Sequence, residues 1–317
     1  MTSLSKAKYL KQYKMSNIIA MMRNNRKEPE VCNDEFKGRL VVITGATSGI
    51  GYETAKEYAA HGADLLLINR NKEKSIAVCE EIRQEFQVKC DYKIADFARL
   101  SDVRYVGKEL LESDLEIDVL IHNAGLYSTK KIYTEDDNEL VFQVNYLASF
   151  ILNYMLKDKL KARGETRIIL VNSEGHRFAV FGIGLHDLKY EKRRHSGLGS
   201  YGVAKTAQLL SIIKFAEYFE ESGVTINAVH PGDVKSNMGL NNGRIYRFFK
   251  KRIVNRTLKS PERSARALYY HGVSKEVEGI SGRFFNLTTE EEPAPPALDR
   301  DAAEELWQKT IELVGLE

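Results

Sequence analysis

The sequence of 317 residues predicts an α/β protein with a doubly wound parallel sheet and helices on both faces. Short β-branched runs alternate with helical stretches along most of the chain, which is typical of crossover units. Within these runs consecutive residues are apolar, so both faces of each strand are apolar, as expected of strands covered by helices on both faces of the sheet. One sheet accounts for residues 37 to about 290, so we expect a single domain.

Each element follows from its local pattern. Apolar runs bounded by turn residues predict strands, and longer stretches with helical periodicity predict helices. The predicted strands cover residues 39–44, 63–69, 89–96, 117–123, 166–173 and 224–230. The predicted helices cover residues 52–62, 72–86, about 100–112, 138–160, a stretch around 201 to about 221, and a C-terminal helix at about 300–315.

Residues 1–36 form a basic N-terminal extension outside this pattern. Seven lysines and arginines precede the first acidic residue, Glu28. The apolar run 18–22 is far too short to span a bilayer. The extension is a basic amphipathic helix on an anionic membrane surface, a helix packed on the body or at a dimer interface, or a frayed arm. We favour packing.

Composition narrows the class of partner. The net charge of +3 is too small to indicate a nucleic-acid partner. Three cysteines stand in no metal-ligand spacing, so we expect no metal site. A sparse, odd cysteine count suits a reducing compartment. We therefore expect a cytoplasmic protein, with weak contact to a membrane surface left open.

Tyr201 and Lys205 lie four residues apart in a helical stretch, so both occupy one face. A surface helix with a lysine over a phenol would give the same spacing. The alternative is acid–base chemistry, because a neighbouring cation lowers the pKa of a phenol from its usual value of about 10. The rest of the chain favours the second interpretation.

A glycine-rich turn at 44–51 joins the first strand to the first helix. Glycines there allow close approach of a pyrophosphate, which binds at a helix N-terminus. The spacing departs from the usual dinucleotide fingerprint, but the strand–turn–helix context fits. The second strand ends at Asn69 and Arg70, where an acidic residue would select NAD(H). The guanidinium of Arg70 suits a 2′-phosphate and so favours NADP(H).

Four segments then stand in a fixed order: 44–51, 122–125, Ser173 and 201–205. Together they resemble the short-chain dehydrogenase/reductase family over nearly the whole chain from Lys37. Residues 281–286 and 306–315 resemble its retinol-dehydrogenase-like branch. The resemblance implies a single Rossmann-type domain at 37–317 with a substrate lid at about 235–262, and a homodimer.

The resemblance also assigns roles. It implies a catalytic set in which Tyr201 is the acid–base, Lys205 tunes it, Ser173 holds the substrate oxygen and Asn145 holds a proton-carrying water. The implied cofactor-binding residues are Gly45, Thr47, Ser48, Gly49, Ile50, Gly51, Asn69, Arg70, Asp96, Phe97, Asn123, Ala124, Gly125, Tyr201, Lys205, Pro231, Gly232, Val234 and Ser236.

Three positions depart from the family pattern. His122 replaces an asparagine, Asn172 replaces a serine, and Ser236 replaces a threonine. None removes a catalytic group. We expect His122 to be a buried histidine with its hydrogen bonds satisfied.

We therefore predict an NADP(H)-dependent oxidoreductase acting on a carbonyl or alcohol carbon. Residues 244–260 combine aromatic and basic side chains, and two interpretations stay open. The segment either covers a bulky lipophilic substrate, such as a retinoid, steroid or polyketide, or is a plain helix packed on the body. Two other functions stay open. One is a non-catalytic NADP-binding scaffold or redox sensor, and the other is a reductase of carbon–carbon double bonds.

Overall fold

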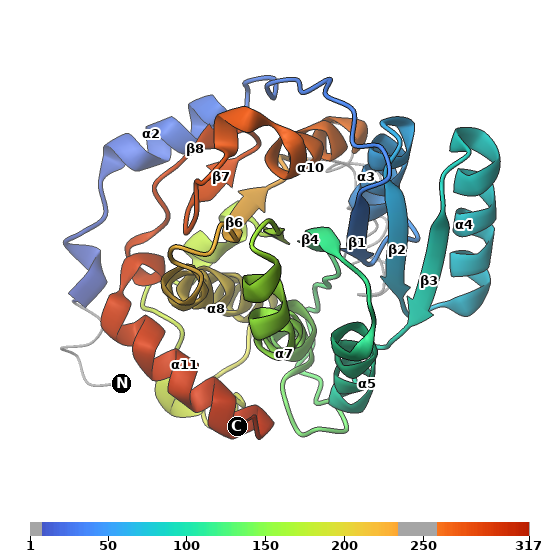
Figure 1. The fold of residues 1–317 in the computed structure, drawn as a ribbon. Helices are drawn as coiled ribbons and strands as arrows, with labels where there is room; N and C mark the ends of the chain where they lie inside the picture. Colours follow the sequence, from blue (N-terminus) through green and yellow to red (C-terminus); the bar gives the residue numbers. More distant parts are fainter. Residues whose placement is uncertain (1–7, 234–258, 317) are drawn as a thin grey trace.

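The computed structural model describes residues 8–233 and 259–316. Its strands form one sheet in the order β3-β2-β1-β4-β5-β6-β7-β8 (Figure 1). The strands are β1 Leu40–Thr44, β2 Asp64–Asn69, β3 Cys90–Ile94, β4 Ile117–His122, β5 Arg167–Val171, β6 Thr225–His230, β7 Phe284–Asn286 and β8 Thr289–Glu290. Neighbouring strands from β3 to β7 pair in parallel. The doubly wound fold is thus confirmed, with one difference: β8 returns antiparallel to β7.

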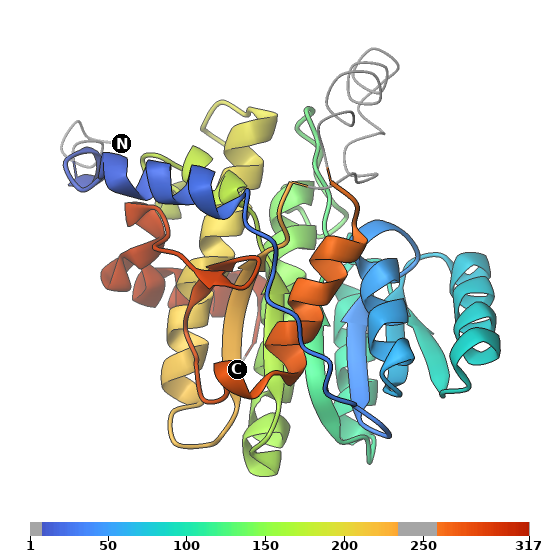
Figure 2. The same cartoon turned by 90° about the horizontal axis from the view of Figure 1, so that it is seen from above.

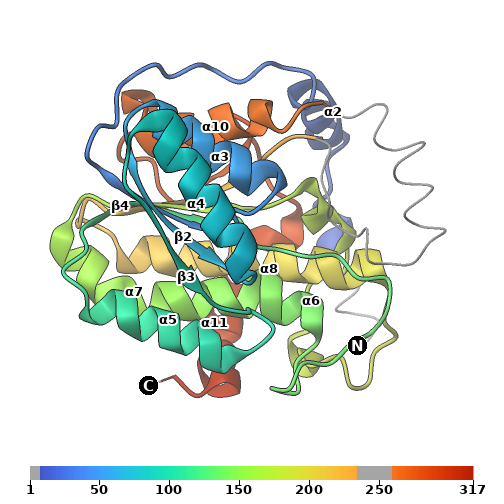
Figure 3. The same ribbon diagram turned by 90° about the vertical axis from the view of Figure 1, so that its right-hand side faces the viewer.

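Helices cover both faces of the sheet (Figure 3). One face carries α5 Leu100–Glu112, α7 Ala148–Arg163 and α8 Gly197–Tyr218, with α11 Arg300–Val314 packed outside α8. The other carries α3 Gly49–Ala60, α4 Lys72–Phe86 and α10 Glu262–Val273. Alternate residues of β1 enter the two cores, Val42 on one side and Val41 and Ile43 on the other. Burial on both faces explains the continuous apolar runs.

The helix predicted at 138–160 is interrupted. A short α6, Leu140–Phe142, leads into a π-helical turn at Gln143–Leu147, and α7 follows. Hydrophobic periodicity cannot reveal such a turn here, because every residue from Val141 to Asn153 is buried and no exposed face marks the change in register. Turns of this kind are frequent at functional sites.

The N-terminal extension is packed on the body. Its helix α2, Met15–Asn24, buries Asn24 and lies close to the β7–β8 hairpin (Figures 1 and 2). The chain then runs along α10 (Figure 2). There the hydroxyl of Tyr269 donates to the carbonyl of Asp34. Packing was the alternative we favoured. However, α2 leaves Met15, Ile19 and Met22 more than half exposed. In the described residues, no helix combines the length and hydrophobicity needed to cross a bilayer.

Candidate active site

The glycine-rich turn lies where the strand order reverses, between β1 and β4. Such a switch point is the usual ligand crevice of a doubly wound sheet. The side chain of Asn123 donates to the carbonyls of Thr44 and Gly45 at 3.0 and 2.9 Å. A Cβ on Gly51 would lie 2.4 Å from Asn123 Nδ2, and one on Gly45 would lie 2.8 Å from Ala124 Cα. These two glycines therefore let the two loops lock together.

The remaining part of the turn is open. Gly49 has φ +60°, and a Cβ placed there would meet nothing within 4 Å. The side chain of Ser48, the N-cap of α3, makes no capping hydrogen bond, and the first turn of α3 has no acidic residue. Unpaired backbone N–H groups at a helix N-terminus suit an anion. The predicted residues Thr47, Ser48 and Ile50 lie here, so the turn fits a dinucleotide pyrophosphate.

Asn69 and Arg70 behave differently at the end of β2. Asn69 is buried, and its Oδ1 accepts from the backbone N–H of Ala46 at 2.7 Å, so it braces the glycine-rich turn. Arg70 is exposed and forms no hydrogen bond or ion pair with any residue that the structure describes. Its guanidinium is therefore available to a ligand.

Asp96 and Phe97 lie in the loop after β3. The Oδ1 of Asp96 accepts from the N–H of Ala98 at 3.0 Å, and its own N–H donates to Asp102 Oδ2 at 2.9 Å. Phe97 is buried. The local hydrogen bonds hold Asp96 at the same edge of the sheet as the glycine-rich turn.

Tyr201 and Lys205 lie one turn apart on α8, with Lys205 Nζ 5.8 Å from the centre of the phenol ring. Lys205 is buried and donates to the carbonyl of Val171 at 2.7 Å and to Gln208 Oε1 at 3.0 Å. Burial lowers the pKa of Lys205 to about 7.

The expectation that Lys205 lowers the pKa of the phenol is not met in the protein alone. Burial raises the pKa of Tyr201 above its ordinary value, and only a hydrogen bond with the Ser173 side chain acts against it. The physical reason is that desolvation disfavours both the phenolate and the ammonium. Since the pKa of Lys205 is itself lowered to about 7, its amine is positively charged for only part of the time near neutral pH.

Ser173 begins the 3₁₀ turn Glu174–Phe178 after β5, and its Oγ accepts from the N–H of Gly175 at 3.0 Å. Because that bond uses a lone pair, the hydroxyl keeps its proton, which serves the hydrogen bond with Tyr201 in the protein alone and can be redirected to a substrate oxygen. Asn172, the departure from the family pattern, ties this serine to α8. Its Oδ1 accepts from the N–H of Ser173 at 2.8 Å, and its Nδ2 donates to the Lys205 carbonyl and to Gln208 Oε1, both at 3.0 Å.

Sequence reasoning missed two residues here. A Cβ on Gly175 would lie 2.6 Å from Cε1 of Tyr201, so only glycine allows the turn to contact the ring edge. Gln208 accepts from both Lys205 and Asn172 through one oxygen. Each had one weak signal in the sequence. Gly175 is a glycine two residues after the serine, and Gln208 is a polar residue on the same face of an apolar helix as Lys205.

Asn145 lies in the π-helical turn and faces the end of β4. Its Oδ1 accepts from the N–H of Leu126 at 2.7 Å, and its Nδ2 donates to the carbonyl of Leu126 at 2.9 Å. A Cβ on Gly125 would lie 3.2 Å from Asn145 Oδ1. Asn145 therefore fixes the segment around Gly125, and no hydrogen bond joins its side chain to Lys205.

The turn after β6 borders the site from the other side. The hydroxyl of Ser264 donates to the carbonyl of Pro231 at 2.6 Å, and Gly232 has φ +80°. The predicted residues Val234 and Ser236, and most of the predicted lid at 235–262, lie outside the described residues.

His122 is buried, as expected, and its Nε2 donates to Asn153 Oδ1 at 2.7 Å. Its Nδ1 has no partner among the described residues. Burial lowers the pKa of His122 to about 4, so the ring is neutral. The hydrogen-bond expectation is thus met at one ring nitrogen. Among the described residues, no group of three or more His, Cys, Asp or Glu could hold a metal ion.

A switch-point turn that fits a dinucleotide, with a tyrosine, a lysine and a serine at the same edge of the sheet, is the arrangement expected of a nicotinamide-dependent oxidoreductase. Residues 39–185 match the model of the short chain dehydrogenase family. The chain is 35% identical to human retinol dehydrogenase 13, with 88% of this chain and 86% of that protein aligned. It is 32% identical to mouse retinol dehydrogenase 14 over 93% of this chain and 91% of that protein.

The chain therefore belongs to the short-chain dehydrogenase family, in its retinol-dehydrogenase-like branch. Its fold is also similar to a solved structure described as an NAD(P)-dependent gluconate 5-dehydrogenase from Beutenbergia cavernae with bound NADP. That match has a TM-score of 0.63 and 23% identity, and it covers 84% of this chain and 99% of the other.

Proposed function

We propose that this protein is an NADP(H)-dependent oxidoreductase that interconverts a carbonyl and an alcohol on a lipophilic small molecule. The observation that carries the proposal is the meeting of Ser173, Tyr201 and Lys205 at the edge of the sheet where the glycine-rich turn also lies. Purely binding scaffolds need no buried lysine next to a buried phenol, and burying both groups costs stability.

The bound nicotinamide would supply or accept the hydride. Tyr201 transfers the proton at the substrate oxygen, and the Ser173 hydroxyl, which is hydrogen-bonded to Tyr201 in the protein alone, donates to that oxygen and holds it in place. Lys205 uses two of its donors on Val171 and Gln208, which leaves the third for the cofactor ribose when the amine is protonated.

Asn145 would hold a water that passes protons toward Lys205. Its side chain spends one amide proton and one oxygen lone pair on Leu126. The second proton and the second lone pair are therefore left for a water.

The preference for NADP(H) is supported by Arg70. It stands at the end of β2, where the adenosine ribose lies in this fold, and it has no partner in the described part of the chain. The NADP bound to the structural relative is consistent with this assignment.

A lipophilic substrate is supported by the names of the two retinol dehydrogenase relatives. The exposed rings of Phe178 and Phe181, on the segment that follows Ser173, add apolar surface near the site. We also propose residues 1–36 as an extension to a single domain at 37–317. The homodimer, the cytoplasmic location and the lid at about 235–262 stay predictions.

The test is NADPH consumption across aldehydes and ketones of graded size and hydrophobicity. Tyr201→Phe should bind NADPH normally and lose at least ~10²-fold in kcat, the scale of a positioned acid–base. Wild-type turnover by Tyr201→Phe would exclude the mechanism. Failure of the wild type to oxidise or reduce any member of the panel, with either cofactor, would exclude the function.

A further inference from the structure

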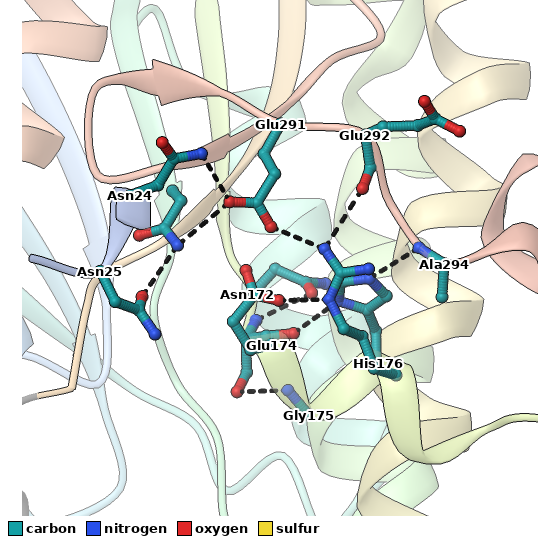
Figure 4. Close-up of polar contacts among 12 residues, drawn as sticks. Asn24, Asn25, Asn172, Glu174, Gly175, His176, Glu291, Glu292 and Ala294 are labelled. Atoms are coloured by element: carbon teal, nitrogen blue, oxygen red, sulfur yellow. Dashed lines mark hydrogen bonds and ion pairs between the residues drawn. The ribbon is translucent and has the colours of Figure 1, made fainter. Parts of the chain in front are cut away.

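A buried polar network joins the N-terminal extension to the turn that carries Ser173 (Figure 4). It starts at Asn24, the last residue of α2, whose Nδ2 donates to Glu291 Oε2 at 2.9 Å. Asn286 of β7 donates to the same oxygen at 3.3 Å and to Asn25 Oδ1 at 2.8 Å. Two segments far apart in sequence, 24–25 and 286–291, thus meet at Glu291.

Arg177 continues the network toward the active site. Its Nη2 lies 2.6 Å from Glu291 Oε1, and its Nε lies 2.6 Å from Glu174 Oε2. Only 2% of the Glu291 side chain is exposed. One guanidinium therefore bridges two carboxylates, and one of these immediately follows Ser173. The same 3₁₀ turn contains Gly175, which contacts the Tyr201 ring.

The extension makes a second set of contacts, with the turn after β6. Asn25 Nδ2 lies 3.4 Å from Asp233 Oδ2. Glu28 forms an ion pair with Arg263 at 3.0 Å, and the carbonyl of Lys27 accepts from the same guanidinium. Arg263 in turn borders Gly232, where an added Cβ would lie 3.1 Å from Nη1.

We propose that residues 24–28 are part of the active-site framework, with Arg177 and Glu291 as positioning residues. They hold the Ser173 turn and the Pro231–Gly232 turn in a fixed relation to each other. This inference rests on the proposed function, because it gives those turns their roles. The extension would then be required for turnover although it touches neither substrate nor cofactor.

Charge balance explains why the network is sensitive. Arg177 and Glu291 are the charged groups that face Glu174, and the adjacent His176 and His230 are kept neutral because burial lowers the pKa of each to about 3. Burial, reinforced by Glu291, raises the pKa of Glu174 to about 7. Removing one member of a buried ion cluster leaves its partner uncompensated.

The principal variants are Glu291→Gln, which removes the charge at nearly constant shape, and the milder Asn24→Ala. The matched controls are Glu292→Gln, next in sequence with an exposed side chain, and Ser16→Ala on the exposed side of α2. For each full-length protein we would measure kcat and KM for a carbonyl substrate, NADPH affinity by fluorescence, and amide hydrogen exchange of residues 172–179.

Both principal variants should bind NADPH as the wild type does. They should lose about tenfold in kcat/KM, toward the ~10²-fold that a 1 Å misplacement costs. Exchange in 172–179 should become faster. The pH profile gives a further readout, because Glu291→Gln removes the charge that raises the pKa of Glu174. The acidic limb of kcat/KM should therefore lie at lower pH in Glu291→Gln than in the wild type.

Unchanged kcat/KM and unchanged exchange in both variants would overturn the inference, as would equal effects in the controls. Hydrogen exchange needs no substrate, so it tests the network even if the wild type turns over nothing. In that case the proposed function fails, while faster exchange in the variants would still support the framework.

Discussion

Gly175→Ala tests the contact between the serine turn and the acid–base. The new Cβ would lie 2.6 and 2.8 Å from Cε1 and Cδ1 of Tyr201. Carbon atoms in contact stand about 3.5–4.0 Å apart, so the ring or the turn must move by about 1 Å. A displacement of that size costs ~10²-fold in rate, which corresponds to about 2.7 kcal/mol in the barrier.

We expect Gly175→Ala to fold and to bind NADPH, with kcat reduced about 100-fold. Overpacking should lower stability by about 1–3 kcal/mol. The matched control is Gly107→Ala in α5, where the nearest atom is the sulfur of Met155 at 2.8 Å. That flexible side chain can turn away, so the control should keep its activity.

Steady-state kinetics, NADPH titration and thermal unfolding of both variants measure kcat, cofactor affinity and stability. Wild-type kcat in Gly175→Ala would refute the argument, since it would mean that the ring tolerates a 1 Å shift. Loss of NADPH binding in parallel with kcat would also refute it, because the damage would then lie in the cofactor site.

Three further predictions concern the cofactor, acid stability and the extension. Arg70→Ala should raise KM for NADPH about tenfold or more while leaving NADH unaffected, as expected for a charge-assisted hydrogen bond of ~1.5–3 kcal/mol; equal losses with both cofactors would contradict it. Burial lowers the pKa of His122 and His271 to about 4 and of His176 and His230 to about 3. Below pH 6.5 the unfolded chain therefore binds protons that the folded protein does not. The free energy of unfolding should fall by about 1.4 kcal/mol per pH unit for each histidine as the pH drops from 6.5 toward 4. Chemical denaturation from pH 7 to 4 measures this slope. The variant His122→Gln keeps a donor for Asn153, and its unfolding should take up about one proton fewer, so its slope should be smaller by the contribution of one histidine. Co-sedimentation with anionic liposomes should show at most weak binding that disappears at physiological salt, because the basic residues of the extension are screened over about 8 Å; tight, salt-resistant binding that is lost without residues 1–30 would reverse our preference for packing.

Local sequence patterns were sufficient to predict most of the helices and strands and their order. Strands β1 to β6 and helices α4, α5 and α11 coincide with the predicted ranges to within about two residues. Strands that are buried on both faces are continuous apolar runs, and helices that are buried on one face show helical periodicity, so both leave a local pattern in the sequence. It also predicted which side chains would gather at the carboxyl edge, since parallel strands end on one side. The short β7–β8 hairpin lacked such a pattern, and only residues 281–286 were singled out, through the family resemblance.

The surroundings of the active-site side chains follow from the tertiary structure and could not be predicted from local sequence. The pKa of Tyr201 is raised rather than lowered because burial depends on the whole fold, not on the spacing to Lys205. The requirement for glycine at position 175 arises from a ring on another element. Asn24 meets Glu291 across 267 positions of sequence, a separation at which local periodicity carries no information. Partners so distant are brought together by sheet order and packing, so the role of the extension follows from the folded chain alone.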